Sequence, residues 1–72
     1  SPDSATAPQI ASITRLARDQ RLTDDERMRI QGLLLDGMSK AKASEVMEYF
    51  YGKSIKQGSE WIRVEEGVLS SR

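Results

Sequence analysis

Residues 37–52 read Gly-Met-Ser-Lys-Ala-Lys-Ala-Ser-Glu-Val-Met-Glu-Tyr-Phe-Tyr-Gly, and they predict one complete helix at 39–51. Gly37 ends the preceding helix and Gly52 ends this one, because glycine readily adopts the left-handed conformation that follows many helices. Ser39 is the predicted N-cap. The apolar residues that follow recur at helical spacing and form the predicted buried face: Ala43, Val46, Met47 and Phe50.

Two further helices are predicted before this one, at about 7–20 and 24–36. Each begins with the spacing of a capping box, in which a Thr is followed three residues later by Gln or Glu: Thr6 with Gln9, and Thr23 with Glu26. Apolar residues then fall on one face of each helix: Ile10, Ile13, Leu16 and Ala17 in the first, and Ile30, Leu33 and Leu34 in the second. The short connection after the second helix makes it a close neighbour of the third.

The apolar pattern weakens after Gly52, where residues 53–58 read as a polar connector. Residues 59–64 are expected to form either a helical turn or a short extended segment. We expect Trp61 and Ile62 to fold back over the helices, because a small core gains much from one buried indole. Residues 1–5 are predicted to be a flexible linker, 6–64 the domain, and 65–72 a loose tail. The predicted fold class is therefore all-α, a three-helix mini-domain with a short C-terminal segment packed on its core.

Composition excludes several classes of function. The 72 residues include neither cysteine nor histidine, so disulfides, thiolate metal sites and the usual general base are not available. Asp24, Asp25 and Glu26 are contiguous at a helix start, where acids complement the helix dipole instead of forming a calcium loop. No apolar run is long enough to span a bilayer. We expect a cytoplasmic protein that is not an enzyme and has no catalytic residue, metal, cofactor, small-molecule substrate or membrane partner.

Eleven basic and eleven acidic residues give zero formal charge, so any nucleic-acid contact needs a local basic patch. Ser39, Lys40 and Lys42 are the main candidates, because lysines beside the free N–H groups of a helix N-terminus can hold a phosphate. The alternative is a solvated mixed-charge surface, which Glu45 and Glu48 favour. Further candidates for nucleic-acid binding are Arg15, Arg18, Lys53 and Lys56, with Tyr49 as an outward aromatic residue that could stack on a base.

Met28 and Leu35 lie seven residues apart, on nearly the opposite side of the second helix from its main apolar stripe. They either pack under the C-terminal segment or form an exposed apolar patch. An exposed patch would serve a protein partner or self-association.

Residues 6–51 resemble a small helical module found at the C-terminal ends of phage-type single-strand annealing and recombination proteins and in uncharacterised bacterial domains. The likeness rests on Ala7-Pro8-Gln9-Ile10-x-x-Ile13-x-x-Leu16 and on Met38-Ser39-Lys40-Ala41-Lys42-Ala43-Ser44-Glu45-Val46. It implies a helical fold and a recombination context, and carries over Gln9, Ser39, Lys40, Ala43 and Ser44.

A second likeness is to the helix-turn-helix domains of transposases and resolvases. It covers Leu22 to Ser39 and the following Ala43-Ser44-Glu45-Val46-Met47, but the recognition helix expected near Ser54 is interrupted by Gly58. The resulting hypothesis is a DNA-binding module of a phage, plasmid or other mobile-element protein, which contacts single- or double-stranded DNA. The alternative is a protein-interaction or oligomerisation module that docks through Met28 and Leu35.

Overall fold

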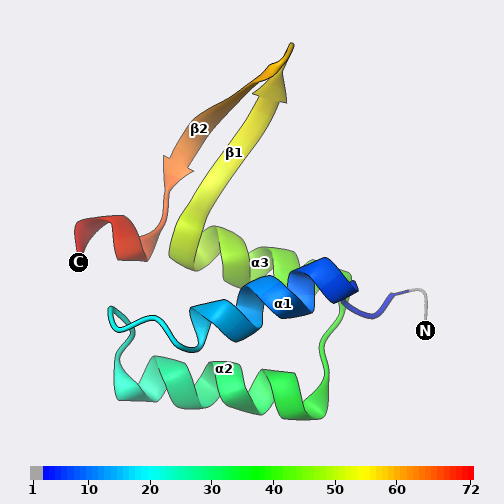
Figure 1. The fold of residues 1–72 in the computed structure, drawn as a ribbon, viewed down its shortest axis with the longest axis vertical. Coiled ribbons are helices and arrows are strands. Elements are labelled where there is room, and N and C mark those ends of the chain that lie inside the picture. Colours follow the sequence, from blue (N-terminus) through cyan, green and yellow to red (C-terminus); the bar gives the residue numbers. More distant parts are fainter. Residues whose placement is uncertain (1–2) are drawn as a thin grey trace.

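A computed structural model describes residues 3–72 as three helices followed by an antiparallel hairpin and a short 3-10 helix (Figure 1). The elements are α1 (Ala7–Leu16), α2 (Asp24–Asp36), α3 (Lys40–Tyr51), β1 (Gly52–Gln57), β2 (Glu60–Glu66) and η1 (Val68–Ser71). The all-α prediction is therefore wrong, because the segment after α3 forms a two-stranded sheet. The chain is a mixed helix-and-sheet protein.

The predicted capping residues define the starts of all three helices. Thr6 with Gln9 and Thr23 with Glu26 form complete capping boxes, in which each side chain accepts from the partner's backbone N–H. Ser39 Oγ accepts from the Lys42 N–H at 3.0 Å. These contacts satisfy N–H groups that a helix start otherwise leaves free.

The first helix ends four residues earlier than predicted, at Leu16. Arg27 of α2 explains the turn that follows, because its guanidinium donates to the Ala17 carbonyl at 3.0 Å and to the Asp19 carbonyl at 2.8 Å. The Asp19 carboxylate also accepts from the Arg21 backbone N–H at 2.8 Å. These bonds hold residues 17–22 as a compact turn that directs Leu22 into the core.

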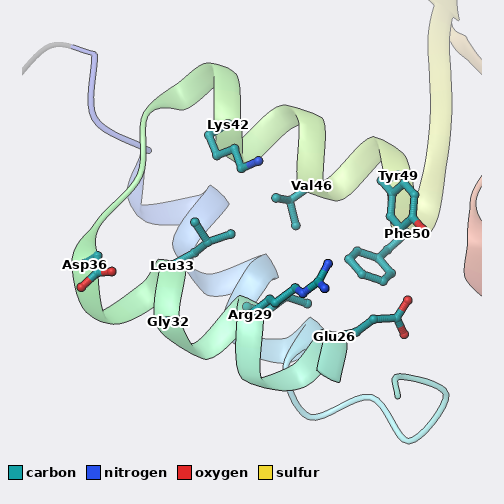
Figure 2. A pocket seen from close by; sticks show the side chains of 10 residues that line it. Glu26, Arg29, Gly32, Leu33, Asp36, Lys42, Val46, Tyr49 and Phe50 are labelled. Atoms are coloured by element: carbon teal, nitrogen blue, oxygen red, sulfur yellow. The ribbon is translucent and has the colours of Figure 1, made fainter. Parts of the chain in front are cut away.

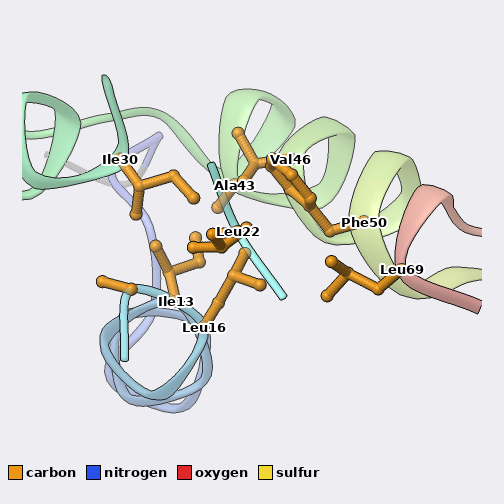
Figure 3. Packing of buried hydrophobic residues seen from close by; sticks show 9 residues of the cluster. Ile13, Leu16, Leu22, Ile30, Ala43, Val46, Phe50 and Leu69 are labelled. Carbon is orange, nitrogen blue, oxygen red and sulfur yellow. The ribbon is translucent and has the colours of Figure 1, made fainter. Parts of the chain in front are cut away.

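The core lies between the helices and is closed by one residue of the C-terminal segment (Figure 3). Leu69 of η1 is 2 % exposed and packs with the buried residues of the helices and the α1–α2 turn: Ile13, Leu16, Ala17, Leu22, Ile30, Ala43, Val46 and Phe50. Met47, which we predicted to be buried, is only partly so. The prediction of a loose tail at 65–72 is corrected by this burial of Leu69.

The hairpin projects from the helices instead of covering them (Figure 1). Gln57 pairs with Glu60 across a two-residue turn, in which Gly58 has a φ of 66°. Trp61 is 70 % exposed and Ile62 39 % exposed, so the prediction that they cover the core is wrong. The strands pair with each other and not with a helix, and the segment that covers the core follows them.

Two glycines let the base of the hairpin approach the end of α3. Gly52 has a φ of 94°, a conformation that other residues adopt only with strain. A Cβ atom on Gly67 would collide with the backbone carbonyl of Phe50. The backbone at the end of α3, near Gly52, therefore lies directly against the backbone that leads from β2 into η1, near Gly67.

The N-terminal segment is also paired where the structure describes it. Of the predicted linker at 1–5, residues 1 and 2 lie outside the described part. The Ala5 N–H donates to the Met38 carbonyl at 2.9 Å, and the Lys40 N–H donates to the Asp3 carbonyl at 2.7 Å. Residues 3–5 are thus bound along the α2–α3 turn and do not form a free linker. Within residues 3–72, no helix has the length and apolar character needed to cross a membrane.

Candidate functional site

The hairpin presents two different faces. Direct cross-strand partners share a face, and alternate residues of one strand lie on the same side. Lys56 pairs with Trp61 and Ser54 pairs with Arg63, so these four residues occupy one face, which we call the basic–aromatic face. Ile55 pairs with Ile62 on the other face. The outer part of this face thus combines an indole with two cations, and Glu66, the partner of Gly52, is the acid at the base of the hairpin.

The side chains of this face are available to a ligand. Trp61 is 70 % exposed, and Lys56 and Arg63 are also exposed. Neither cation forms an ion pair within the part of the chain that the structure describes, which contrasts with Arg21 and Arg72. The hairpin therefore presents one large aromatic surface beside two exposed cationic side chains.

A hollow of about 460 Å³ lies between the base of this face and the helices. Ser54 and Trp61 contribute from the hairpin, and the remaining lining comes from α1, α3 and the junction: Gln9, Ser44, Met47, Glu48, Tyr51, Gly52 and Lys53. The indole thus forms one wall of an open concave surface. A flat group such as a base could enter it and contact the indole.

The N-terminus of α3, our main candidate from the sequence, is already occupied by contacts of the chain. The Lys40 and Lys42 N–H groups donate to the Asp3 carbonyl and to Ser39 Oγ. Lys42 Nζ also lies 3.8 Å from a carboxylate oxygen of Glu45. A phosphate at this end would meet fewer free N–H donors than an uncovered helix start provides. The role predicted for this cluster stays a prediction.

The structure does not gather the predicted basic residues into one patch. Helices α1 and α3 run side by side with their N-termini at the same end of the molecule (Figure 1). Gln9 of α1 donates to the Lys40 carbonyl at 3.4 Å. Arg15 lies six residues further along α1, a rise of about 9 Å, and Arg18 follows the end of that helix. Lys53 and Lys56 lie on the hairpin, beyond the C-terminal end of α3.

Tyr49, Met28 and Leu35 lie on other surfaces. Tyr49 is 57 % exposed and lines the groove between α2 and α3, with its ring edge-on to Phe50 at a centroid distance of 4.9 Å. Met28 and Leu35 are 69 % and 89 % exposed, so the C-terminal segment does not cover them. Tyr49 is thus a groove residue and does not belong to the basic–aromatic face.

Sequence reasoning did not assign Trp61 or Arg63 to a binding site. The signal that could have found them is Gly58-Ser59, a dipeptide typical of two-residue hairpin turns. Once that turn is placed, Lys56 and Trp61 come into register as partners. The alternation of each strand then places Arg63 beside Trp61 on the same face.

The two carboxylates whose pKa is lowered lie in the α1–α2 turn and in the first turn of α2, away from the basic–aromatic face. A hydrogen bond from Arg72 lowers the pKa of Glu26 to about 2, and one from Arg21 lowers the pKa of Asp19 to about 2. Arg72 donates to both oxygens of Glu26, at 2.5 and 3.1 Å, which ties the C-terminal segment to the start of α2. No group of three or more potential metal-ligating side chains occurs within residues 3–72.

No protein-family model matches this chain, and neither a curated protein nor a solved structure is significantly similar to it.

Proposed function

We propose that this chain is a non-enzymatic DNA-binding module that contacts single-stranded DNA through the basic–aromatic face of its hairpin. The observation that carries the proposal is the exposed indole of Trp61, held on a β-ribbon beside Lys56 and Arg63. Proteins that bind single strands combine stacking on aromatic rings with cations that follow the phosphates. The resemblance of residues 6–51 to a module of recombination proteins implies a nucleic-acid or recombination context, and we place the protein in the cytoplasm.

Single-stranded DNA fits this face better than duplex DNA does. An indole stacks on a base only when the base face is accessible, which the stacked interior of a duplex does not provide. A two-stranded ribbon can also enter the major groove of a duplex, where it reads base edges by hydrogen bonding. On this face Trp61 offers mainly an apolar surface, so stacking is the interaction it favours.

The expected binding is local and sensitive to salt. The net charge of zero gives no long-range attraction to DNA, so affinity must come from a few contacts. Lys56 and Arg63 would neutralise two phosphates, which corresponds to a slope of about −1.4 in a plot of log K against log salt concentration. Loss of the stacked indole would cost about 1–3 kcal/mol, or roughly 5- to 150-fold in affinity.

Trp61 is the only tryptophan, so its fluorescence reports contact directly. We would titrate the protein with a single-stranded oligonucleotide at low salt and measure both tryptophan quenching and the anisotropy of the labelled DNA. Trp61→Ala and the double variant Lys56→Gln/Arg63→Gln should each weaken binding, and the double variant should also reduce the salt slope.

The double variant Lys40→Gln/Lys42→Gln is the matched control, because it removes the same charge at the far end of α3. The proposal predicts that the control binds almost as well as the wild type. Weaker binding by this control together with normal binding by the hairpin variants would place the contact at the α3 N-terminus. Tighter binding of a duplex than of a single strand, or no binding of either at low salt, would refute the proposal.

A further inference from the structure

The outer face of α2 carries an exposed apolar strip that is not packed into the core. Met28, Gly32 and Leu35 are spaced by four and three residues and therefore lie along one side of the helix. Met28 is 69 % and Leu35 89 % exposed. A Cβ atom on Gly32 would meet nothing within 4 Å among residues 3–72. Glycine destabilises a helix interior relative to alanine, and nothing inside this fold requires it here.

A charged strip runs beside the apolar strip. Arg29 and Asp36 lie on the side of α2 that faces the groove between α2 and α3, a space of about 530 Å³ (Figure 2). Arg29 is paired with Asp25 at 3.7 Å, but both side chains are more than 80 % exposed. An exposed pair of this kind contributes little free energy, so Arg29 can exchange its partner at small cost.

The two strips are complementary to themselves under a two-fold rotation. In an antiparallel pair of α2 helices centred on Gly32, residues whose distances before and after Gly32 differ by no more than one residue, a rise of about 1.5 Å, come close together. Met28 lies four residues before Gly32 and Leu35 three after it, so each meets the other in the second copy. Arg29 lies three before Gly32 and Asp36 four after it, so these also meet. The rotation keeps each strip on its own side, as an isologous interface requires.

We propose that α2 is a homodimer interface, in which a second copy packs antiparallel on Met28, Gly32 and Leu35. Two ion pairs between Arg29 of one copy and Asp36 of the other then lie along one side of the apolar contact. Gly32 lets the two helix backbones approach closely at the two-fold axis, which explains a glycine in mid-helix. The charge pattern favours a second copy of this chain as the partner, because the same strip carries both Arg29 and Asp36, the two members of each ion pair.

The dimer is expected to be weak. A single pair of helices buries less than the roughly 800 Å² per partner of a standard interface. The zero net charge provides little long-range repulsion between copies. Helix α2 lies at the end of the molecule away from the hairpin, so dimerisation leaves the basic–aromatic face accessible (Figure 1). The dimer proposal therefore stands independently of DNA binding.

A charge-reversal experiment tests the pairing. Sedimentation equilibrium should show that the average mass of the wild type rises with protein concentration. Arg29→Asp and Asp36→Arg should each weaken self-association at least tenfold, because like charges then face each other twice. An equimolar mixture of the two variants should associate again, since one variant carries two acids in the strip and the other two cations.

Arg18→Asp is the matched control, since it reverses one exposed arginine on a different surface. It should dimerise like the wild type and should not restore association when mixed with Asp36→Arg. A second test is Gly32→Leu, which should weaken association at least tenfold while circular dichroism shows the helices intact. A wild type that stays monomeric at millimolar concentration, or a mixture that behaves like its separate components, would overturn the proposal.

Discussion

Leu69→Ala tests whether the C-terminal segment is part of the folded core. Leu69 is 2 % exposed, and it lies beside Phe50 at one end of the buried cluster (Figure 3). Truncating a buried leucine to alanine costs about 2–5 kcal/mol. A chain of 72 residues has a free energy of unfolding of about 4–11 kcal/mol. The substitution should therefore remove a large part of the stability and lower the Tm by at least about 8 °C.

The assay is urea and thermal unfolding followed by far-ultraviolet circular dichroism. Tryptophan emission is a poor probe of this loss, because Trp61 is exposed in the folded chain. Val64→Ala is the control, since Val64 is a hairpin residue that is 48 % exposed and should lose less than about 1 kcal/mol. If Leu69→Ala unfolds within about 0.5 kcal/mol of the wild type, the segment is not docked and the reasoning fails.

Three further predictions concern the helices and the hairpin base. Because Arg72 holds the pKa of Glu26 at about 2 instead of 4.5, this pair should stabilise the fold fully above about pH 4.5 and progressively less as the pH falls toward 2. Glu26→Gln should therefore show a smaller decrease in Tm between pH 5 and about pH 2.5 than the wild type; an equal decrease would contradict this. Gly32→Ala should stabilise the monomer by about 0.5–1 kcal/mol in urea unfolding at low protein concentration, since the added Cβ atom meets no neighbour. Gly52→Ala should instead destabilise the protein by about 1–3 kcal/mol, because φ is 94° and the new Cβ atom would meet the Glu65 carbonyl; equal stability would show that the hairpin base can shift.

The helices could be predicted because their signals are local. A Thr and the Gln or Glu three residues later specify the start of α1 and of α2. The end of α2 follows from Gly37, and its bounds agree with the predicted 24–36. The end of α1 could not be read in this way, because it depends on the guanidinium of Arg27 reaching back from the next helix. That contact joins residues ten apart, and no spacing rule predicts it.

The hairpin was missed because neither of its strands has a buried face. In a half-buried strand, apolar and polar residues alternate, and this alternation is the main strand signal. Residues 53–57 contain a single large apolar residue, Ile55, and it is 42 % exposed. Only the turn dipeptide Gly58-Ser59 marks the structure. Leu69 was missed for a related reason, since a four-residue helix is too short to show a periodic pattern.

The position of the hairpin explains how an exposed tryptophan can coexist with a small core. An isolated two-stranded hairpin is at best marginally stable in water. Here the two ends of the hairpin are held by buried residues, Phe50 just before β1 and Leu69 just after β2. The core therefore fixes the base of the ribbon, and the base fixes the register of Lys56 with Trp61. Because Trp61 contributes little to the core, substitutions there should alter DNA binding and leave stability nearly unchanged. Leu69→Ala should show the reverse: it should lower the stability of the protein, while the molecules that remain folded still bind DNA.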